Sequence, residues 1–385
     1  MRRTLKFFVI AALATACSDP TATPVTASGD TDAPLASSTA DLEAPHYTPA
    51  LLPQLPHATW SAALAINASG VAVGVSEVPV EWRFIGEGGA MPCRVPVATV
   101  FRAYDATSLQ PALQQALGMT SPCGVASIAL DVNDREEVVG VTWRPGEFGY
   151  DYGFVWSKAG GVKLFKALGA TVISAINNNS VAVGYFDRDG YNTPDLVYWR
   201  PNGGGSTPSV PFSRVMWSWD ISNDGVVSGC WNYFAFKMDF AGRLETNEEY
   251  CNAQYSLHWI YDQRIPKTGG INASGVAVYS NAQSVPVMWG GGRSKGVPVG
   301  WAPGAATGIS DRNRIVGWRT STTAPLHLAM TRSAGGRVLS LPGLPAGSAT
   351  EAYAVNRCGH VVGATFDASN TSRAMLWKLS RCDTP

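Results

Sequence analysis

The chain has 385 residues and carries 29 basic and 29 acidic side chains, so its formal net charge is zero. Such a surface lacks the positive field that nucleic acid or an anionic bilayer would attract, and the sequence therefore indicates no nucleic-acid partner. Only 15% of the residues are charged, whereas glycine contributes 40 residues and Trp, Tyr and Phe contribute 13 each. This composition is typical of short β-strands joined by tight turns and argues against a helix-rich fold.

The first 17 residues have the features of a secretory signal. A basic start is followed by an apolar run over residues 7–13, which is too short to span a bilayer. The segment ends in Leu-Ala-Thr-Ala-Cys and resembles a bacterial lipoprotein box with Cys17 as the lipidated residue, although Leu13 stands four rather than three positions before Cys17. The alternative is an ordinary cleavage site beside an incidental cysteine. Because Ser18 follows Cys17, we expect an outer-membrane lipoprotein of the bacterial cell envelope, held to the membrane only by its lipid, or a secreted protein.

Residues 18–45 are predicted to form a disordered tether. The stretch consists almost entirely of Ser, Thr, Ala, Pro, Asp and Gly and contains no aromatic residue. It offers too little apolar surface to offset the entropy of ordering. The remaining residues, 46–385, are predicted to form one domain.

Seven segments of ten residues repeat one pattern across this domain. The first is AINASGVAVG and the last is AVNRCGHVVG, and the interval between copies is about 45 residues except for a longer first interval. Each has Asn or Ser at its third position, namely Asn67, Asn133, Asn177, Ser222, Asn272, Ser310 and Asn356. These residue types favour the first position of a type I turn, where the side chain accepts a hydrogen bond from the amide two residues on. The flanking alternation of apolar residues predicts two strands around this turn.

Three positions after the Asn or Ser, the turn requires a residue that tolerates the left-handed conformation. Glycine occupies this position in four copies, whereas Glu136, Ser180 and Asn313 replace it in the others, so these three turns are expected to be altered. The segments end in glycine, except that Tyr279 takes the place of the last glycine in the fifth copy.

Two further strands are predicted in each repeat. A short strand ends in a large side chain, in most repeats about ten to sixteen residues after the hairpin, and an apolar strand follows it. The large residues are Trp156, Trp199, Phe236, Trp289, Met330 and Trp377, with Tyr104 as the expected counterpart in the first interval. Four short strands in about 45 residues predict one blade of a β-propeller, and seven repeats predict an all-β, seven-bladed propeller.

The repeat resembles the bacterial extracellular HAF family. That family's signature is a small residue, Ile-Asn, two residues, Gly and Val-x-Gly, followed by an aromatic-ended strand, and the resemblance covers essentially residues 50–378. It implies an exported, propeller-like protein and no particular activity.

The ends of the domain are predicted to close the ring. The repeat region begins inside a unit, since Leu51–Leu55 matches Leu339–Leu344, and ends inside a unit with the Trp377 strand. We therefore expect residues 48–56 and 372–378 to lie in one sheet, which would remove the open edges of the array. We expect this closed ring to be a monomer.

Six cysteines remain besides Cys17, an even number in an exported chain. Fifteen pairings are possible, and proximity in the sequence favours Cys93 with Cys123, Cys230 with Cys251, and Cys358 with Cys382. The first pair would close the extra residues of the first interval, an insertion at about 77–125.

The sequence offers few residues for chemistry. Its five histidines have no metal-ligand spacing, no serine lies in a nucleophile elbow, and no cofactor is indicated. A weak calcium candidate, resembling half of a calcium loop without the later bidentate Glu, consists of Asp187, Asp189, Asn192 and Asp195. A solvated turn is the alternative for this segment.

Asp131 and Asp220 occupy the small-residue position two before the turn Asn or Ser, on strands predicted to lie near the ring axis. They are candidate channel ligands, and the alternative is that each caps a neighbouring amide. The residues between 217 and 261 are rich in aromatics, and a candidate platform for sugar rings comprises Trp219, Trp231, Tyr255 and Trp259. Packing between blades is the alternative for these side chains.

Three functions stay open from the sequence. The first is a lipid-anchored binding module for a protein or glycan partner, which the tether, the repeat and the missing catalytic constellation favour. The second is a glycan hydrolase or lyase that uses Asp131 and Asp220, which requires the two carboxyl groups to lie about 5 to 10 Å apart at an open pocket. The third is a structural component of the envelope.

Overall fold

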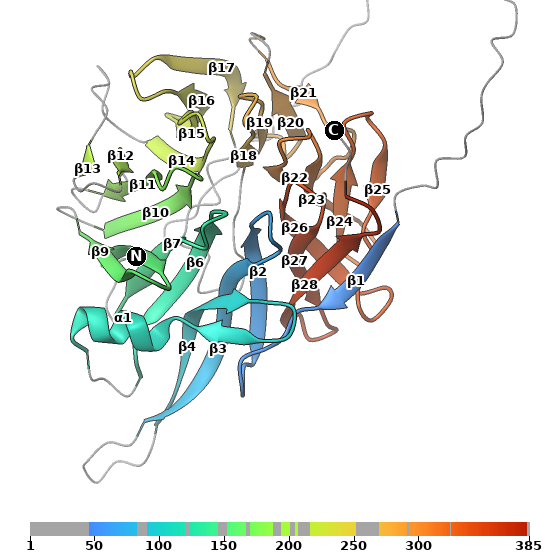
Figure 1. Cartoon of the computed structure of the whole chain (residues 1–385). Helices are drawn as coiled ribbons and strands as arrows, with labels where there is room; N and C mark the ends of the chain where they lie inside the picture. Colours follow the sequence, from blue (N-terminus) through green and yellow to red (C-terminus); the bar gives the residue numbers. More distant parts are fainter. Residues whose placement is uncertain are drawn as a thin grey trace, which may run out of the picture. The chain divides into compact units, whose positions relative to one another are not determined.

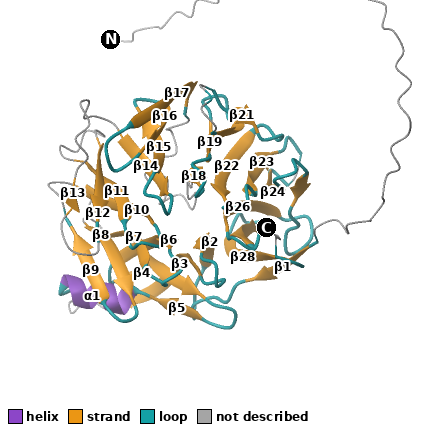
Figure 2. Ribbon diagram, turned by 45° about the horizontal axis from the view of Figure 1, so that its top comes forward, coloured by secondary structure: helices purple, strands orange, loops and turns teal. Residues whose placement is uncertain are grey.

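Each predicted repeat forms a small antiparallel sheet of four strands, and seven such sheets surround a common centre (Figure 1). The computed structural model describes residues 46–82, 91–119, 123–144, 152–166, 170–187, 194–200, 205–206, 216–251, 269–290, 293, 295–323 and 325–382. The first strand of each sheet lies nearest the centre and the fourth at the periphery (Figure 2). The protein is therefore a seven-bladed β-propeller, as the sequence predicts.

The blades follow one another along the chain. Blade 1 comprises β2 (Trp60–Ile66), β3 (Ala72–Trp82), β4 (Met91–Phe101) and β5 (Ala106–Ser108). Blade 2 comprises β6 (Ala126–Val132), β7 (Val138–Trp143), β8 (Tyr152–Ser157) and β9 (Gly161–Phe165). Blade 3 comprises β10 (Ala170–Ile176), β11 (Ala182–Asp187), β12 (Pro194–Trp199) and β13 (Gly205–Ser206). Blade 4 comprises β14 (Met216–Ile221), β15 (Val227–Trp231), β16 (Phe234–Met238) and β17 (Leu244–Tyr250).

The last three blades complete the ring. Blade 5 comprises β18 (Gly269–Ile271), β19 (Ala277–Ser280), β20 (Pro286–Trp289) and β21 (Val297–Pro298). Blade 6 comprises β22 (Gly304–Ile309), β23 (Ile315–Thr320), β24 (His327–Arg332) and β25 (Val338–Ser340). Blade 7 comprises β26 (Ala349–Val355), β27 (Val361–Phe366), β28 (Ser372–Leu379) and β1 (Tyr47–Leu51).

Blade 7 contains both ends of the domain, which confirms the predicted closure. The N-terminal strand β1 pairs antiparallel with β28, from Tyr47 opposite Leu379 to Leu51 opposite Met375. Tyr47 is buried, and its hydroxyl donates a hydrogen bond of 3.1 Å to the carbonyl oxygen of Gly359. The start of the domain therefore supplies the fourth strand of this blade.

The close approach of the first strand explains why six of the seven repeats end in glycine. In six blades the first strand carries a β-bulge opposite this glycine, for example between Ala63 and Ala65. A Cβ at Gly74 would lie 2.1 Å from the carbonyl oxygen of Ala62, which no side chain can tolerate. Blade 5 has no such shift, and there Tyr279 lies opposite Gly269, so the glycine is on the partner strand.

The seven hairpin turns are alike, so the expectation of three altered turns is wrong. Glu136, Ser180 and Asn313 take φ values of 57°, 59° and 58°, in the same left-handed region as the four glycines at this position. The amide of each donates to the carbonyl of the Asn or Ser three residues before, as it does in the glycine-containing turns. The cross-blade contacts described below hold the turn, and they outweigh the local preference for glycine.

The expected counterpart in the first interval is also wrong. Phe101 lies opposite Ala72 as Trp377 lies opposite Val361, and it is fully buried. Tyr104, by contrast, is 98% exposed in the connection between β4 and β5. The large residue of the third strand in blade 1 is therefore Phe101, three residues before Tyr104.

The extra residues of the first interval form a protrusion and a helix. Strands β3 and β4 are each 11 residues long and pair along their whole length, far beyond the five or six residues of β15 or β11. The helix α1 (Gln110–Leu117) follows β5, buries Leu113 and ends at Gly118 in the left-handed conformation. Within the described residues, no helix is long and apolar enough to cross a membrane.

Candidate functional site

The strand directions divide the ring into two faces. The turns between first and second strands and the connections between third and fourth strands lie at one end of the blades, because neighbouring strands are antiparallel. We call this end the turn face. The connections between second and third strands, and between one blade and the next, lie at the opposite end, which we call the loop face.

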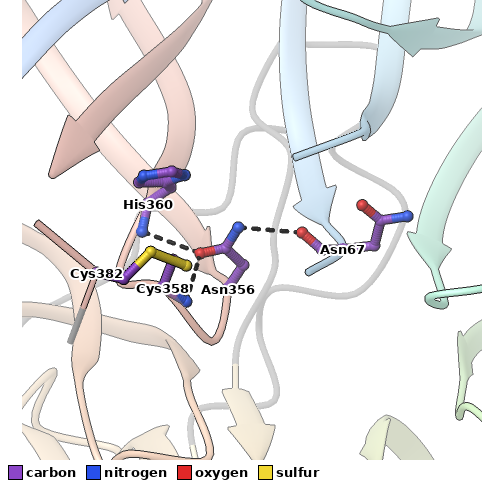
Figure 3. The surroundings of a disulfide bond; sticks show 5 residues. All are labelled: Asn67, Asn356, Cys358, His360 and Cys382. Atoms are coloured by element: carbon purple, nitrogen blue, oxygen red, sulfur yellow. Dashed lines mark hydrogen bonds between the residues drawn. A yellow bond between two sulfur atoms is a disulfide. The ribbon is translucent and has the colours of Figure 1, made fainter. Parts of the chain in front are cut away.

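A ring of asparagine side chains ties the turn face together. The Oδ1 of Asn177 accepts hydrogen bonds from the amides of Asn179 and Val181, both 3.0 Å, while its Nδ2 donates to the carbonyl oxygen of Ser222 in the next blade at 3.1 Å. Corresponding cross-blade bonds are donated by Asn67, Asn133, Asn272 and Asn356. The bond from Asn356 reaches Asn67, and it therefore links the last blade to the first (Figure 3).

Two blades have serine in place of this asparagine, and other side chains link them to their neighbours. Ser222 and Ser310 still accept a hydrogen bond from the amide four residues on, but within the described part of the chain neither side chain bonds to the next blade. In blade 4, Asp220 accepts from the amide of Ile271 in blade 5 at 3.0 Å. In blade 6, Thr307 donates to the carbonyl oxygen of Ala352 in blade 7 at 2.7 Å.

Both candidate channel carboxylates cap amides of the next blade. Asp131 Oδ2 accepts from the amide of Ile176 at 2.9 Å, as Asp220 does from Ile271. The two side chains are half-buried, and blade 3 lies between the blades that carry them. The geometry favours the capping role, and their use as a catalytic pair stays a prediction.

Connections on the loop face differ widely in length. Only two residues, 232–233, join β15 to β16, whereas residues 251–268 join β17 to β18. On the turn face, five residues separate the first and second strands in every blade, as between Ile66 and Ala72. The long β3–β4 hairpin also projects from the loop face. In repeat proteins such variation collects on the side that binds partners.

The three predicted disulfides are present. Cys93–Cys123 anchors the β3–β4 protrusion to the segment before β6, and Cys230–Cys251 joins two strand ends at the loop face. Cys358–Cys382 attaches the C-terminal tail to the hairpin turn of blade 7, beside Asn356 (Figure 3). Three disulfides indicate an oxidising compartment, outside the cell or in its envelope.

One cluster on the loop face combines titratable and aromatic side chains from two blades. His327 begins β24 of blade 6, and its Nδ1 bonds to Oε1 of Glu351 on β26 of blade 7. The hydroxyl of Tyr353 donates to Oε2 of the same carboxylate at 2.6 Å. The indole of Trp318 lies against the imidazole, with ring centroids 4.6 Å apart and planes inclined by 21°.

Sequence reasoning missed this cluster because its members are separated by up to 35 residues and meet only between blades. His327 has no second histidine at ligand spacing, and it was therefore not singled out. A signal did exist at Glu351, five residues before the turn Asn356. The same position is apolar in five of the other six repeats, as Ala62, Ile128, Val172, Trp217 and Ala305, and is Lys267 in the fifth repeat.

The candidate aromatic platform is divided by the structure. Trp219 is half-buried and stacks on Tyr279 of the next blade, with centroids 5.8 Å apart, and Trp231 packs against a core cluster of blades 3 and 4. Tyr255 and Trp259 lie outside the described residues. Two other rings, those of Tyr233 and Tyr250, are 61% and 55% exposed on the loop face.

The calcium candidate falls on the connection between β11 and β12. Asp187 ends β11 and Asp195 lies in β12, whereas Asp189 and Asn192 lie outside the described residues. Within the described residues, no three His, Cys, Asp or Glu side chains form a group that could hold a metal ion. The calcium site stays a prediction. Cys17, the signal and the tether also lie outside the described residues.

Comparisons with known proteins define a class by fold. No family model matches the sequence, and no curated protein matches it. A streptogramin B lyase has a TM-score of 0.53 and 10% identity over 87% of this chain and 98% of that chain. Virginiamycin B lyase from Staphylococcus aureus has a TM-score of 0.51 and 8% identity over 87% of this chain and 100% of that chain. At such low identity the likeness shows the propeller fold alone.

Proposed function

We propose that this protein is an exported, lipid-anchored propeller of the HAF-repeat type that binds a protein or a glycan through its loop face. The contrast between the two faces carries the proposal. On the turn face, every hairpin between a first and a second strand has the same length, and most of these hairpins bond to the next blade, so they hold the ring together. The loop face carries the variable connections and the long protrusion, which is the arrangement that recognition sites use.

Exposed aromatic rings on the loop face support a binding role. Tyr250 stacks on Phe234 with centroids 4.8 Å apart, and Tyr233 lies beside them in the two-residue turn between β15 and β16. The Cys230–Cys251 disulfide is next to these rings in the sequence and holds the strand ends that carry them. Rigid, exposed tyrosines provide contact area at low entropic cost.

The proposal is tested with the domain comprising residues 46–385. This domain, a compact unit of its own, is applied to a glycan array and used to capture partners from envelope extracts, and each candidate is then measured in purified form. We expect the double variant Tyr233→Ser/Tyr250→Ser to lower the affinity for a true partner by at least about tenfold, in the range of interface hot spots.

Tyr104→Ser is the matched control, because Tyr104 is an exposed tyrosine on the turn face. This variant should leave the affinity unchanged. A partner that loses affinity with Tyr104→Ser but not with the double variant would contradict the assignment of the faces. A domain that selects no ligand would favour a structural role in the envelope.

A further inference from the structure

The cluster of His327, Glu351 and Tyr353 has an arrangement that determines where its protons lie. Burial, and next to it the negative charge of Glu351, raises the pKa of Tyr353 well above its ordinary value, so the hydroxyl keeps the proton that it donates. A carboxylate only accepts hydrogen bonds. The Nδ1 of His327 must therefore be the donor in its bond to Glu351.

This bond leaves Nε2 of the neutral imidazole as an acceptor. Among the residues that the structure describes, none makes a hydrogen bond to Nε2, and the His327 side chain is 36% exposed. The Glu351 side chain is only 13% exposed, and the indole of Trp318 fixes the plane of the imidazole. A base is thus oriented from within the protein and open toward the loop face.

We propose that His327 is a general base, positioned by Glu351, that activates water for the hydrolysis of a small ester or lactone on the loop face. In this step Nε2 takes a proton from water, and the water oxygen forms a bond to the carbonyl carbon. The bond from that carbon to the leaving oxygen then breaks, and Nε2 returns the proton to the leaving alkoxide. The products are a carboxylic acid and an alcohol, joined in one hydroxy acid if the substrate is a lactone.

Two observations favour an ester over a glycoside. Glycoside hydrolysis uses two carboxyl groups on either side of the bond, whereas the one carboxylate of this cluster is already bonded to Tyr353 and His327. In addition, no Ser, Thr or Cys side chain in the described part of the chain is hydrogen-bonded to the imidazole, so water is the nucleophile that the base can activate. Hydrolysis at His327 does not require a bound protein or glycan partner.

The test uses the full chain and 4-nitrophenyl acetate as the probe. General-base catalysis contributes about a hundredfold or more in well-formed sites, and we expect His327→Gln to lower the hydrolysis rate at least about tenfold. His57→Gln is the matched control, since His57 is an exposed histidine on a loop-face connection and has no carboxylate partner among the described residues. That control should retain the wild-type rate.

The positioning role of Glu351 has its own readout. Nitrogen NMR should find His327 protonated at Nδ1 in the wild type and should show a mixture of tautomers in Glu351→Ala. The hydrolysis rate of Glu351→Ala should also be lower than that of the wild type. If His327→Gln does not fold, labelling of the wild type with diethyl pyrocarbonate replaces it, and the rate should fall in step with modification of His327. A rate that is independent of His327 in either experiment overturns the proposal.

Discussion

The turn face and the loop face are built from the ends of the same strands, yet they differ in what they tolerate. On the turn face, a side chain such as Asn177 caps its own turn and also holds the next blade, so a change in one turn affects its neighbour. On the loop face, connections range from the two residues 232–233 to the 18 residues 251–268. Stability is therefore concentrated on one side of the ring, which leaves the other side able to vary for binding or chemistry.

Opening the ring should cause the largest loss of stability. Deletion of residues 46–51 removes β1, its pairing with β28 and the buried Tyr47. We expect the free energy of unfolding to fall by about 5 kcal/mol, from one large buried side chain and several backbone hydrogen bonds. Such a loss approaches the whole stability of a typical domain. Chemical denaturation followed by tryptophan fluorescence measures the change.

The control for this deletion removes residues 18–44 and keeps β1. Because that stretch is predicted to be a tether, its removal should leave the unfolding midpoint unchanged. An equal loss of stability in both variants would mean that closure by β1 is not what holds the ring.

Removing disulfides one at a time compares the two faces directly. Cys358–Cys382 and Cys93–Cys123 close similar stretches, with sequence separations of 24 and 30, so chain entropy alone predicts about 3 kcal/mol for each. We expect Cys358→Ala/Cys382→Ala to show the full loss in global unfolding. Cys93→Ala/Cys123→Ala should instead mainly speed amide hydrogen exchange in the β3–β4 protrusion, and it should lower the global free energy of unfolding by less. Equal global losses would refute the proposed division of stability between the faces.

The asparagine ring predicts a pair of opposite effects. Asn177→Ala removes three hydrogen bonds at a buried position, and we expect a loss of about 2 to 3 kcal/mol. Asn177→Ser keeps the turn cap, as Ser222 does, and should lose only the cross-blade bond, about 1 kcal/mol. Ser222→Asn should restore a bond to the carbonyl of Asn272 and stabilise the domain by a similar amount. A destabilised Ser222→Asn would show that Asp220 already fills the role of that link.

Repetition explains why the sequence predicts so much of this fold. A hairpin that occurs seven times reveals its turn residues and its alternation, and the incomplete units at the two ends predict the pairing of β1 with β28. The errors arose where one copy departs from the others. Phe101 takes the role assigned to Tyr104 because the first interval is lengthened, and Glu136 accepts a left-handed conformation that favours glycine.

The candidate site was harder to predict because it depends on contacts between blades. His327 and Glu351 are 24 residues apart, and only the packing of blade 6 on blade 7 brings them together. No local pattern indicates which side chain of one blade faces which side chain of the next. Asp131 and Asp220 were found from the repeat, but the repeat alone did not decide between a ligand site and a cap.

The smallest expected change is in the pH dependence of stability, and it arises at His360 in blade 7, beside the hydrogen bond that links this blade to blade 1. Burial, and to a lesser extent the charge of Lys378, lowers the pKa of His360 from its ordinary value of 6.5. The amide of His360 donates to Asn356 Oδ1 at 3.0 Å, next to Cys358 and the link to blade 1 (Figure 3). The folded protein favours the neutral imidazole, so the unfolded chain binds the proton more readily.

This contribution to stability is therefore complete above about pH 6.5 and is lost as the pH falls toward the lowered pKa of the folded state. We expect His360→Gln to reduce the loss of melting temperature between pH 7.5 and pH 5.5. Lys378→Gln should reduce it less, because burial is the main cause of the shift. If His360→Gln leaves the pH dependence of the melting temperature unchanged, protonation of this histidine does not destabilise the folded domain.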